Sequence, residues 1–170
     1  MNAIVMYRSK TGFTRRYAEW IAAALGCKAL EWKAAQSVDL AAYDTLIYGG
    51  WCHAGSIMGL KKFLQVAEPT KKNIVVFATG ASPAENPDIE PAMKKNFTPA
   101  QWERIKAFYC PGGLNYEAMG AVDRALMAAF RAMVKKQEGE GSQMYQMLCK
   151  SYDLTDEKYI EPLVECCKGM

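Results

Sequence analysis

Short apolar runs alternate along the chain with segments of helical periodicity. Five runs predict β-strands, over residues 2–7, 27–32, 45–48, 74–78 and 105–110. Between the first two, apolar residues three and four positions apart predict a helix over 14–25, which Gly26 ends. Strands that alternate with helices in this way predict a parallel sheet with helices on both faces, a doubly wound α/β fold.

The later part of the chain continues this pattern and then adds helix. Residues 59–66 and the proline-punctuated turns over 88–104 predict helices, and Gly49-Gly50 predicts a sharp turn into a loop over 51–58. After the fifth strand the pattern predicts a long helix over 117–136, a break over 137–142 and a last helix with Thr155 as its N-cap.

Three loops follow predicted strands, at residues 8–14, 49–58 and 79–88. In an open parallel sheet, ligands bind outside the carboxyl ends of the strands. We therefore expect all three loops to meet at one edge, which is the candidate binding site.

Composition indicates one globular domain over residues 1–170. The chain is 51% hydrophobic and 23% charged, with a net charge of +3 that is too weak and too dispersed to indicate nucleic acid. No apolar stretch has the length and freedom from charge of a membrane span, and the N-terminus lacks a signal-peptide pattern. We therefore expect a cytoplasmic protein.

Six cysteines and one histidine give little support for a metal site. No Cys-x-x-Cys pair occurs, and His53 is the only histidine, so we expect no zinc or other metal centre. Without a secretion signal, the cysteines are interpreted as reduced thiols, several of them packed in the core.

The segment 9–14 has the composition of an anion-binding turn. It reads Ser-Lys-Thr-Gly-Phe-Thr between the first strand and first helix, where unpaired N–H groups and the helix dipole favour negative charge. Three hydroxyls and a flexible glycine suit a terminal monophosphate. The triphosphate-binding P-loop and the dinucleotide Gly-x-Gly-x-x-Gly patterns are both absent. The alternative is a turn that only caps the helix through Thr14.

These residues resemble the FMN phosphate loop of the flavodoxin family, Ser-x-Thr-Gly-x-Thr after the first strand. The segments 48–57 and 77–80 are similar to the second and third flavin loops of flavodoxin-domain proteins related to menaquinone-dependent protoporphyrinogen oxidase. Residues 116–124 look like the inserted helical segment of that oxidase group. The resemblance implies a flavodoxin-like three-layer sandwich with a five-stranded parallel sheet in the order 2-1-3-4-5. An extra helical segment over about 114–150 and a closing helix over about 155–167 complete it.

The resemblance also implies FMN as the cofactor, with its ring between the second and third loops. The cofactor-binding residues that it implies are Ser9, Lys10, Thr11, Gly12, Phe13, Thr14, Gly50, Trp51, Cys52, His53, Ala54, Gly55, Thr79, Gly80 and Ala81. It identifies no catalytic residue.

Several roles within the second loop stay open. Trp51 or His53 could stack on the ring, or Trp51 could pack against the adjacent helix. His53 could act as an acid or base, or only stack or bind backbone. Cys52 could tune the flavin or be inert. The chain departs from electron-carrier flavodoxins in two ways: residues 79–87 contain no aromatic, and the first loop is surrounded by basic residues.

The function implied is electron transfer through non-covalently bound FMN. One alternative is a protoporphyrinogen-oxidase-like enzyme that passes electrons to a quinone, and another is a flavin-free binding module on the same fold. The partner would be a redox protein, a quinone or a small-molecule substrate, with no nucleic acid. The methionine-rich face of 119–133 is interpreted as core, the alternative being contact with a partner or a membrane surface. The sequence leaves the oligomeric state open.

Overall fold

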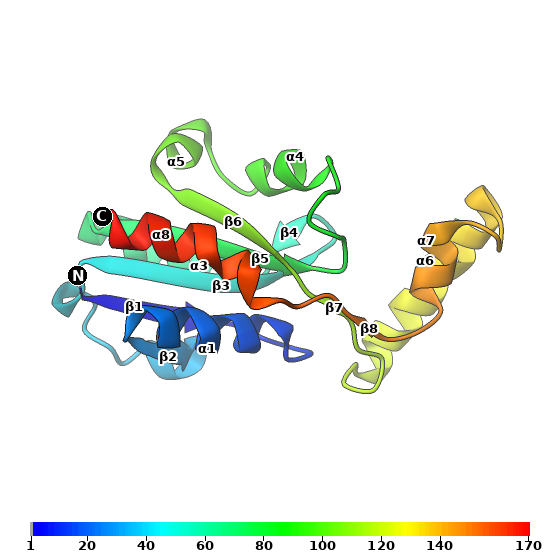
Figure 1. Ribbon diagram of the computed structural model, residues 1–170, viewed down its shortest axis with the longest axis horizontal. Helices are drawn as coiled ribbons and strands as arrows, with labels where there is room; N and C mark the ends of the chain where they lie inside the picture. Colours follow the sequence, from blue (N-terminus) through cyan, green and yellow to red (C-terminus); the bar gives the residue numbers. More distant parts are fainter. Residues whose placement is uncertain (1) are drawn as a thin grey trace.

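The computed structural model describes residues 2–170 and has a central parallel sheet (Figure 1). The strand order is β2-β1-β3-β5-β6, and a short β4 pairs antiparallel with the end of β3. The strands are β1 Ala3–Tyr7, β2 Lys28–Glu31, β3 Thr45–His53, β4 Ser56–Ile57, β5 Asn73–Gly80 and β6 Lys106–Pro111. With β4 set aside, this is the expected order of five parallel strands, so the predicted fold class is confirmed.

Helices cover both faces of the sheet. On one face α1 Phe13–Leu25 packs beside α8 Glu161–Lys168, which follows the 3₁₀ turn η3 Glu157–Ile160. On the other face lie α2 Trp32–Ala35, α3 Leu60–Ala67, α4 Ile89–Lys94 and α5 Pro99–Arg104. Two further 3₁₀ turns, η1 Leu40–Ala42 and η2 Glu68–Thr70, connect elements on this side.

The central strands β1, β3 and β5 are mostly apolar because both of their faces are buried. Along β5, Val75 and Phe77 join the cluster under α1 and α8, whereas Ile74, Val76 and Ala78 join the cluster under α2 to α5. Successive side chains point to opposite faces. This is why the sequence shows continuous apolar runs rather than strict alternation.

Strand β3 passes through the glycine pair instead of turning there. Gly49 and Gly50 lie opposite Phe77 and Ala78 of β5, and the strand continues to His53. A Cβ on Gly49 would lie 2.1 Å from Cζ of Phe77, so glycine here makes room for the neighbouring ring. The predicted turn at 49–50 and the predicted loop over 51–58 are therefore wrong: the segment is a strand end and a β-hairpin.

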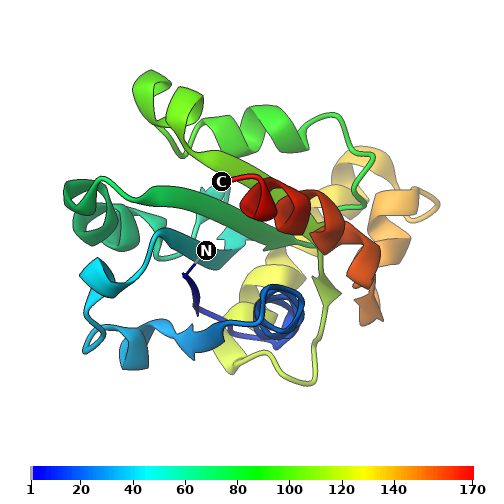
Figure 2. The ribbon, with the colours of Figure 1, turned by 60° about the vertical axis from the view of Figure 1, so that its left-hand side comes forward.

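The segment after β6 forms a small substructure of its own. It comprises β7 Gly113–Leu114, α6 Ala121–Glu138, α7 Gln143–Leu148 and β8 Tyr152–Asp153, with β7 and β8 paired antiparallel. In both ribbon views α6 (yellow) and α7 (orange) lie side by side, beyond the sheet at its β7 end (Figures 1 and 2). The sequence predicted one long helix here, but not α7 or the two-stranded ribbon.

Two expectations for this part of the chain are wrong. The α6 face that includes Val122, Leu126, Phe130 and Met133 is exposed and not packed as core, because the helix buries Val134 on its other side. Thr155 is not the N-cap of the last helix: Asp156 caps the preceding turn η3, its carboxylate accepting from the Lys158 N–H at 3.0 Å, and α8 itself begins after Ile160. Among residues 2–170, no helix has both the length and the apolar character that crossing a membrane requires.

The close approach of β3 and β5 can be tested at Gly49. We expect Gly49→Ala to lower the free energy of unfolding by about 1–3 kcal/mol, because the added methyl must displace the buried Phe77 ring. Urea unfolding measures this. Gly141→Ala is the control, since a Cβ there meets no atom within 4 Å. Equal stability of the two variants would contradict the packing argument.

Candidate functional site

The first loop carries the chain from β1 into α1 at the carboxyl edge of the sheet. The Arg8 N–H donates to the Gly49 carbonyl at 2.9 Å, so the loop starts in register with β3. Gly12 is the residue before α1 and has a φ of 100°, a left-handed conformation that glycine adopts without strain. No side chain caps the helix, so its first N–H groups stay available to a ligand.

Two hydroxyls of this loop are buried, with different surroundings. The Thr14 Oγ1 lies 2.7 Å from Oγ1 of Thr79, which joins the first loop to the end of β5. The Ser9 Oγ is buried and has no hydrogen-bond partner in the described structure. A buried hydroxyl without a partner is unfavourable, so Ser9 is the strongest local indication of a missing ligand.

Three other residues of the segment 9–14 contact the protein itself. The Phe13 side chain is buried against Gly112, so only its backbone could reach a ligand. The Thr11 carbonyl accepts from the Asn115 side chain at 3.4 Å. The Lys10 Nζ lies 2.5 Å from Asp123 of α6.

The second loop is a β-hairpin formed by the end of β3 and β4. Its two-residue turn, Ala54-Gly55, has positive φ at both positions, which is the geometry of a tight hairpin turn. Gly50 lies within β3, Trp51 and Cys52 are half-buried, and His53 is exposed. Burial raises the pKa of the Cys52 thiol to about 11. Cys52 is therefore a neutral thiol near neutral pH and a weak nucleophile.

Trp51 connects the first two loops. The Arg8 guanidinium carbon lies 5.9 Å from the centre of its ring, within range of a cation–π contact. Trp51 is also the register partner of Thr79 in β5. The first, second and third loops therefore meet around Arg8, Thr14 and Thr79.

The third loop begins at Gly80 and is held by two tyrosines from elsewhere. The Tyr152 hydroxyl donates to the Ala81 carbonyl and the Tyr109 hydroxyl to the Ser82 carbonyl, each at 2.8 Å. Burial raises the pKa of both phenols, so they remain neutral donors. The loop itself has no aromatic, but these two rings lie directly beside it.

The charge around the first loop is more balanced than the sequence indicated. Arg16 lies 2.6 Å from Asp153 and Arg15 lies 3.4 Å from Glu19, in addition to the Lys10–Asp123 pair. Asp123 and Asp153 both come from the segment after β6. Basic residues surround the loop as the sequence indicated, but three of them are paired with carboxylates, two of which lie far away in the chain.

Several residues that shape the site were not apparent from sequence. Asn96, after α4, accepts from the Ile57 N–H at 2.8 Å and donates to the Gly55 carbonyl at 2.9 Å, which fixes the hairpin. Asn115, Asp123 and Tyr152 hold the other two loops. Their partners are about 40 to more than 100 residues away in the chain, so no local pattern indicates them.

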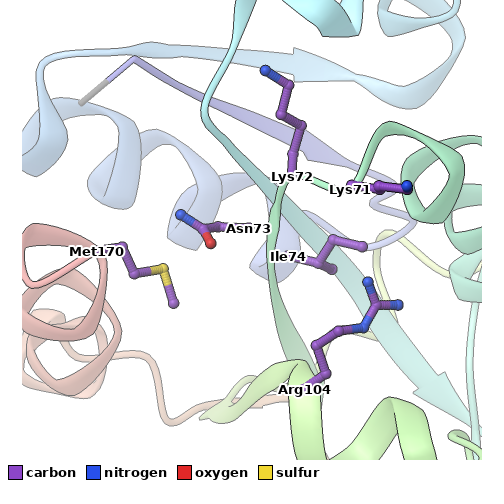
Figure 3. A pocket seen from close by; sticks show the side chains of 6 residues that line it. All are labelled: Lys71, Lys72, Asn73, Ile74, Arg104 and Met170. Carbon is purple, nitrogen blue, oxygen red and sulfur yellow. The ribbon is translucent and has the colours of Figure 1, made fainter.

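Two surface cavities lie largely outside this site, with Arg8 as the one site residue that lines either of them. One, of about 300 Å³, lies at the amino end of β5 and is lined by Lys71, Lys72, Asn73, Ile74, Arg104 and Met170. These side chains point in different directions and do not converge on one point (Figure 3). The other, also about 300 Å³, is lined by Arg8, Glu31, Trp32, Lys33, Gln36 and Lys62. Within residues 2–170, no cluster of His, Cys, Asp or Glu has the arrangement of a metal site.

Together these features make up a candidate anion site with an adjoining rim. The opening turn of α1 offers N–H groups, and Ser9 and Thr14 offer neutral hydroxyls. Such a donor set suits a monophosphate ester. The aromatic Trp51 and the backbone of the third loop border the same edge, where a flat group attached to that phosphate could lie.

Comparison with known proteins gives one family match. A family model described as a flavodoxin domain matches residues 4–140. No curated protein sequence matches the chain.

Several solved structures are similar at low sequence identity. A flavodoxin, WrbA-like protein from Agrobacterium tumefaciens is 20% identical, covering 69% of this chain and 87% of its own, with a TM-score of 0.49. A flavoprotein in complex with FMN from Lactobacillus acidophilus NCFM is 15% identical, covering 65% and 91%, with a TM-score of 0.48. Rubredoxin oxygen:oxidoreductase from the anaerobe Desulfovibrio gigas is 13% identical, covering 99% and 37%, with a TM-score of 0.44.

The role of Asn96 as the hairpin clamp is testable. We expect Asn96→Ala to lower the free energy of unfolding by about 1–3 kcal/mol, because the variant loses the hydrogen bonds to the hairpin. Hydrogen exchange of the 53–57 amides should accelerate at the same time. Asn86→Ala, which removes a local turn bond to Asp88, should leave exchange in the hairpin unchanged. Unchanged exchange in Asn96→Ala would contradict the clamp.

Proposed function

The chain belongs to the flavodoxin-domain family, and from that premise we propose that it binds FMN non-covalently and transfers electrons through it. The observation that carries the proposal is Ser9, whose buried hydroxyl has no partner and lies in the turn that opens α1. A phosphate ester there would accept a hydrogen bond from it and satisfy it.

Different residues of this chain would bind the phosphate and the ring of FMN. Under the proposal, Ser9, Thr11, Thr14 and the first N–H groups of α1 hold the phosphate, and Gly12 allows the backbone to close around it. Trp51 and the backbone around Gly80 and Ala81 border the ring, and His53 and Ala54 lie at its exposed rim. When bound, FMN supplies the group that accepts and returns electrons. The protein binds it, orients it and limits access of water.

The arrangement favours a carrier of electrons over a covalent catalyst. Cys52 is held as a neutral thiol by burial, which makes attack on the cofactor or a substrate unfavourable. His53 is exposed and makes no hydrogen bond that would fix it as an acid or base.

The phosphate assignment can be tested at Ser9 separately from folding. We expect Ser9→Ala to weaken FMN binding at least about tenfold, at 1.5 kcal/mol or more for a hydrogen bond to a charged group. The free energy of unfolding of the FMN-free protein should not fall, because the hydroxyl has no partner to lose. Flavin fluorescence titration and urea unfolding measure the two quantities.

Thr45 provides a matched control. It carries the other buried hydroxyl without a partner, but at the start of β3, at the opposite edge of the sheet. Thr45→Ala should leave the FMN dissociation constant unchanged. If wild-type protein gains no flavin, the chain is a binding module without flavin. If it binds FMN but Ser9→Ala binds equally well, only the placement of the phosphate is wrong.

A second candidate is a protoporphyrinogen-oxidase-like enzyme that passes electrons from a reduced tetrapyrrole to a quinone. The observation in its favour is the helical segment after β6, which contacts the first loop through Asn115 and Asp123 and so borders the site. An enzyme that binds an organic substrate, and does not only exchange electrons, would need such an additional wall for its pocket.

This candidate predicts catalytic turnover. FMN-loaded protein, kept free of oxygen, should oxidise many equivalents of protoporphyrinogen with a menaquinone analogue, as followed by porphyrin fluorescence. Without the quinone it should oxidise less than one equivalent, because only the bound FMN can then accept electrons. The control is the FMN-free protein. Exchange of electrons with a one-electron dye but no oxidation of the tetrapyrrole would leave the carrier as the function.

A further inference from the structure

The outward side of α6 is an apolar surface that no other part of the described chain covers. Four large side chains on it are well exposed: Val122 75%, Leu126 51%, Phe130 40% and Met133 46%. Exposed alanines fill the space between them, at positions 121, 125, 129 and 132. We call this set of eight residues the α6 outer face.

Unlike a normal surface helix, α6 is apolar on its outer side as well as on the inner side, where Val134 is buried. A surface helix turns its apolar stripe toward the core and its charged residues toward water. Here Asp123 pairs with Lys10, and the Arg124 Nε donates to the Tyr116 carbonyl at 3.0 Å, so charged residues face the protein. From 121 to 133 the outer face carries no charge, and Lys136 follows only in the last turn. A partner is therefore expected on the outer side.

The size of the face is sufficient for a protein interface. With full side-chain areas of roughly 200 Å², the exposed fractions of the four large residues amount to about 400 Å² of apolar surface. The alanines add to this, so two such faces would bury on the order of 1,000 Å² together, which is near the lower limit for a specific complex. A patch of this size matches the largest apolar patch of a typical monomer, and such patches are often binding surfaces.

We propose that the α6 outer face binds a second copy of this chain, with the two α6 helices antiparallel and centred on Ala129. In that register Leu126 faces Ala132 of the other copy, and Met133 faces its Ala125. In these two contacts a large side chain thus meets a small one, which is the condition for close helix packing. Because the arrangement has two-fold symmetry, one surface provides both halves of the contact.

The charges support the antiparallel direction. The two Lys136 ammonium groups would lie about 20 Å apart at opposite ends of the pair, at 1.5 Å of rise per residue, which is beyond the ~8 Å screening length. In a parallel pair they would face each other. Half of the face is alanine, which gains little from transfer into lipid but allows a second helix to approach closely. A second protein helix therefore fits better than a membrane.

The first experiment measures self-association. Sedimentation velocity over a concentration series should show a reversible dimer for the wild type. The double variant Leu126→Glu/Met133→Glu should weaken dimerisation at least about 100-fold, because it would bury unpaired carboxylates. Both positions are exposed, so the monomer should fold, as circular dichroism would show. Val66→Glu is the matched control, since Val66 of α3 is 46% exposed on another surface and should leave the dimer intact.

The second experiment tests the register. Ala129→Cys should form a disulfide-linked dimer under mild oxidation, because each residue 129 would face its own copy within reach of a disulfide. Ala128→Cys, one residue earlier in the helix, is the control. It should form no more disulfide-linked dimer than the unsubstituted protein, whose native cysteines set the background. A dimer that Leu126→Glu/Met133→Glu does not weaken would overturn the proposal. So would a wild-type monomer at all concentrations, including one that binds vesicles of anionic lipid through this face.

Discussion

Parallel pairing of β1, β3 and β5 determines which residues can meet at the carboxyl edge of the sheet. Gly49 lies opposite Tyr7 on one side and Phe77 on the other, and two residues later Trp51 lies opposite Thr79. A slip of one residue would exchange the side chains of β3 between the two cores, so burial on both faces fixes the register. Gly49 leaves the room that the Phe77 ring needs beside this pairing. The site therefore depends on core packing that no ligand would touch.

The segment after β6 contacts the candidate site at both of its ends. Its start donates from Asn115 to the first loop, and its end donates from Tyr152 to the third loop. It also supplies Asp123 and Asp153, which pair with basic residues of the first loop and of α1. These pairs are partly solvent-exposed, so each contributes little to stability. Their larger effect is to leave neutral hydroxyls and N–H groups as the donors available to an anion.

The sequence pattern predicted those features that depend on residues close together in the chain. The five strands and their parallel order followed from apolar runs and from family resemblance, and the three loops from their positions after strands. The glycine pair at 49–50 misled because glycine favours turns locally, whereas the Phe77 ring that requires it is 28 positions away. The apolar stripe of the helix 121–138 predicted core packing wrongly. Such a stripe indicates that an apolar surface is to be covered, but it does not show whether the same chain or another molecule covers it. Asn96 and Tyr152 left no signal, because their roles depend on contacts across the fold.

The anion site and the α6 outer face share one physical link, the ion pair between Lys10 and Asp123. Dimerisation can change the free energy of cofactor binding through this link only by as much as it changes the free energy of the ion pair. Cofactor binding changes the free energy of dimerisation by the same amount. The Lys10 side chain is 48% exposed, and pairs of this kind contribute about 0–1 kcal/mol. That limit corresponds to a change in affinity of a few-fold. A monomeric variant should therefore keep its anion site, and the protein without flavin should keep its helix pair, so evidence against either proposal leaves the other standing.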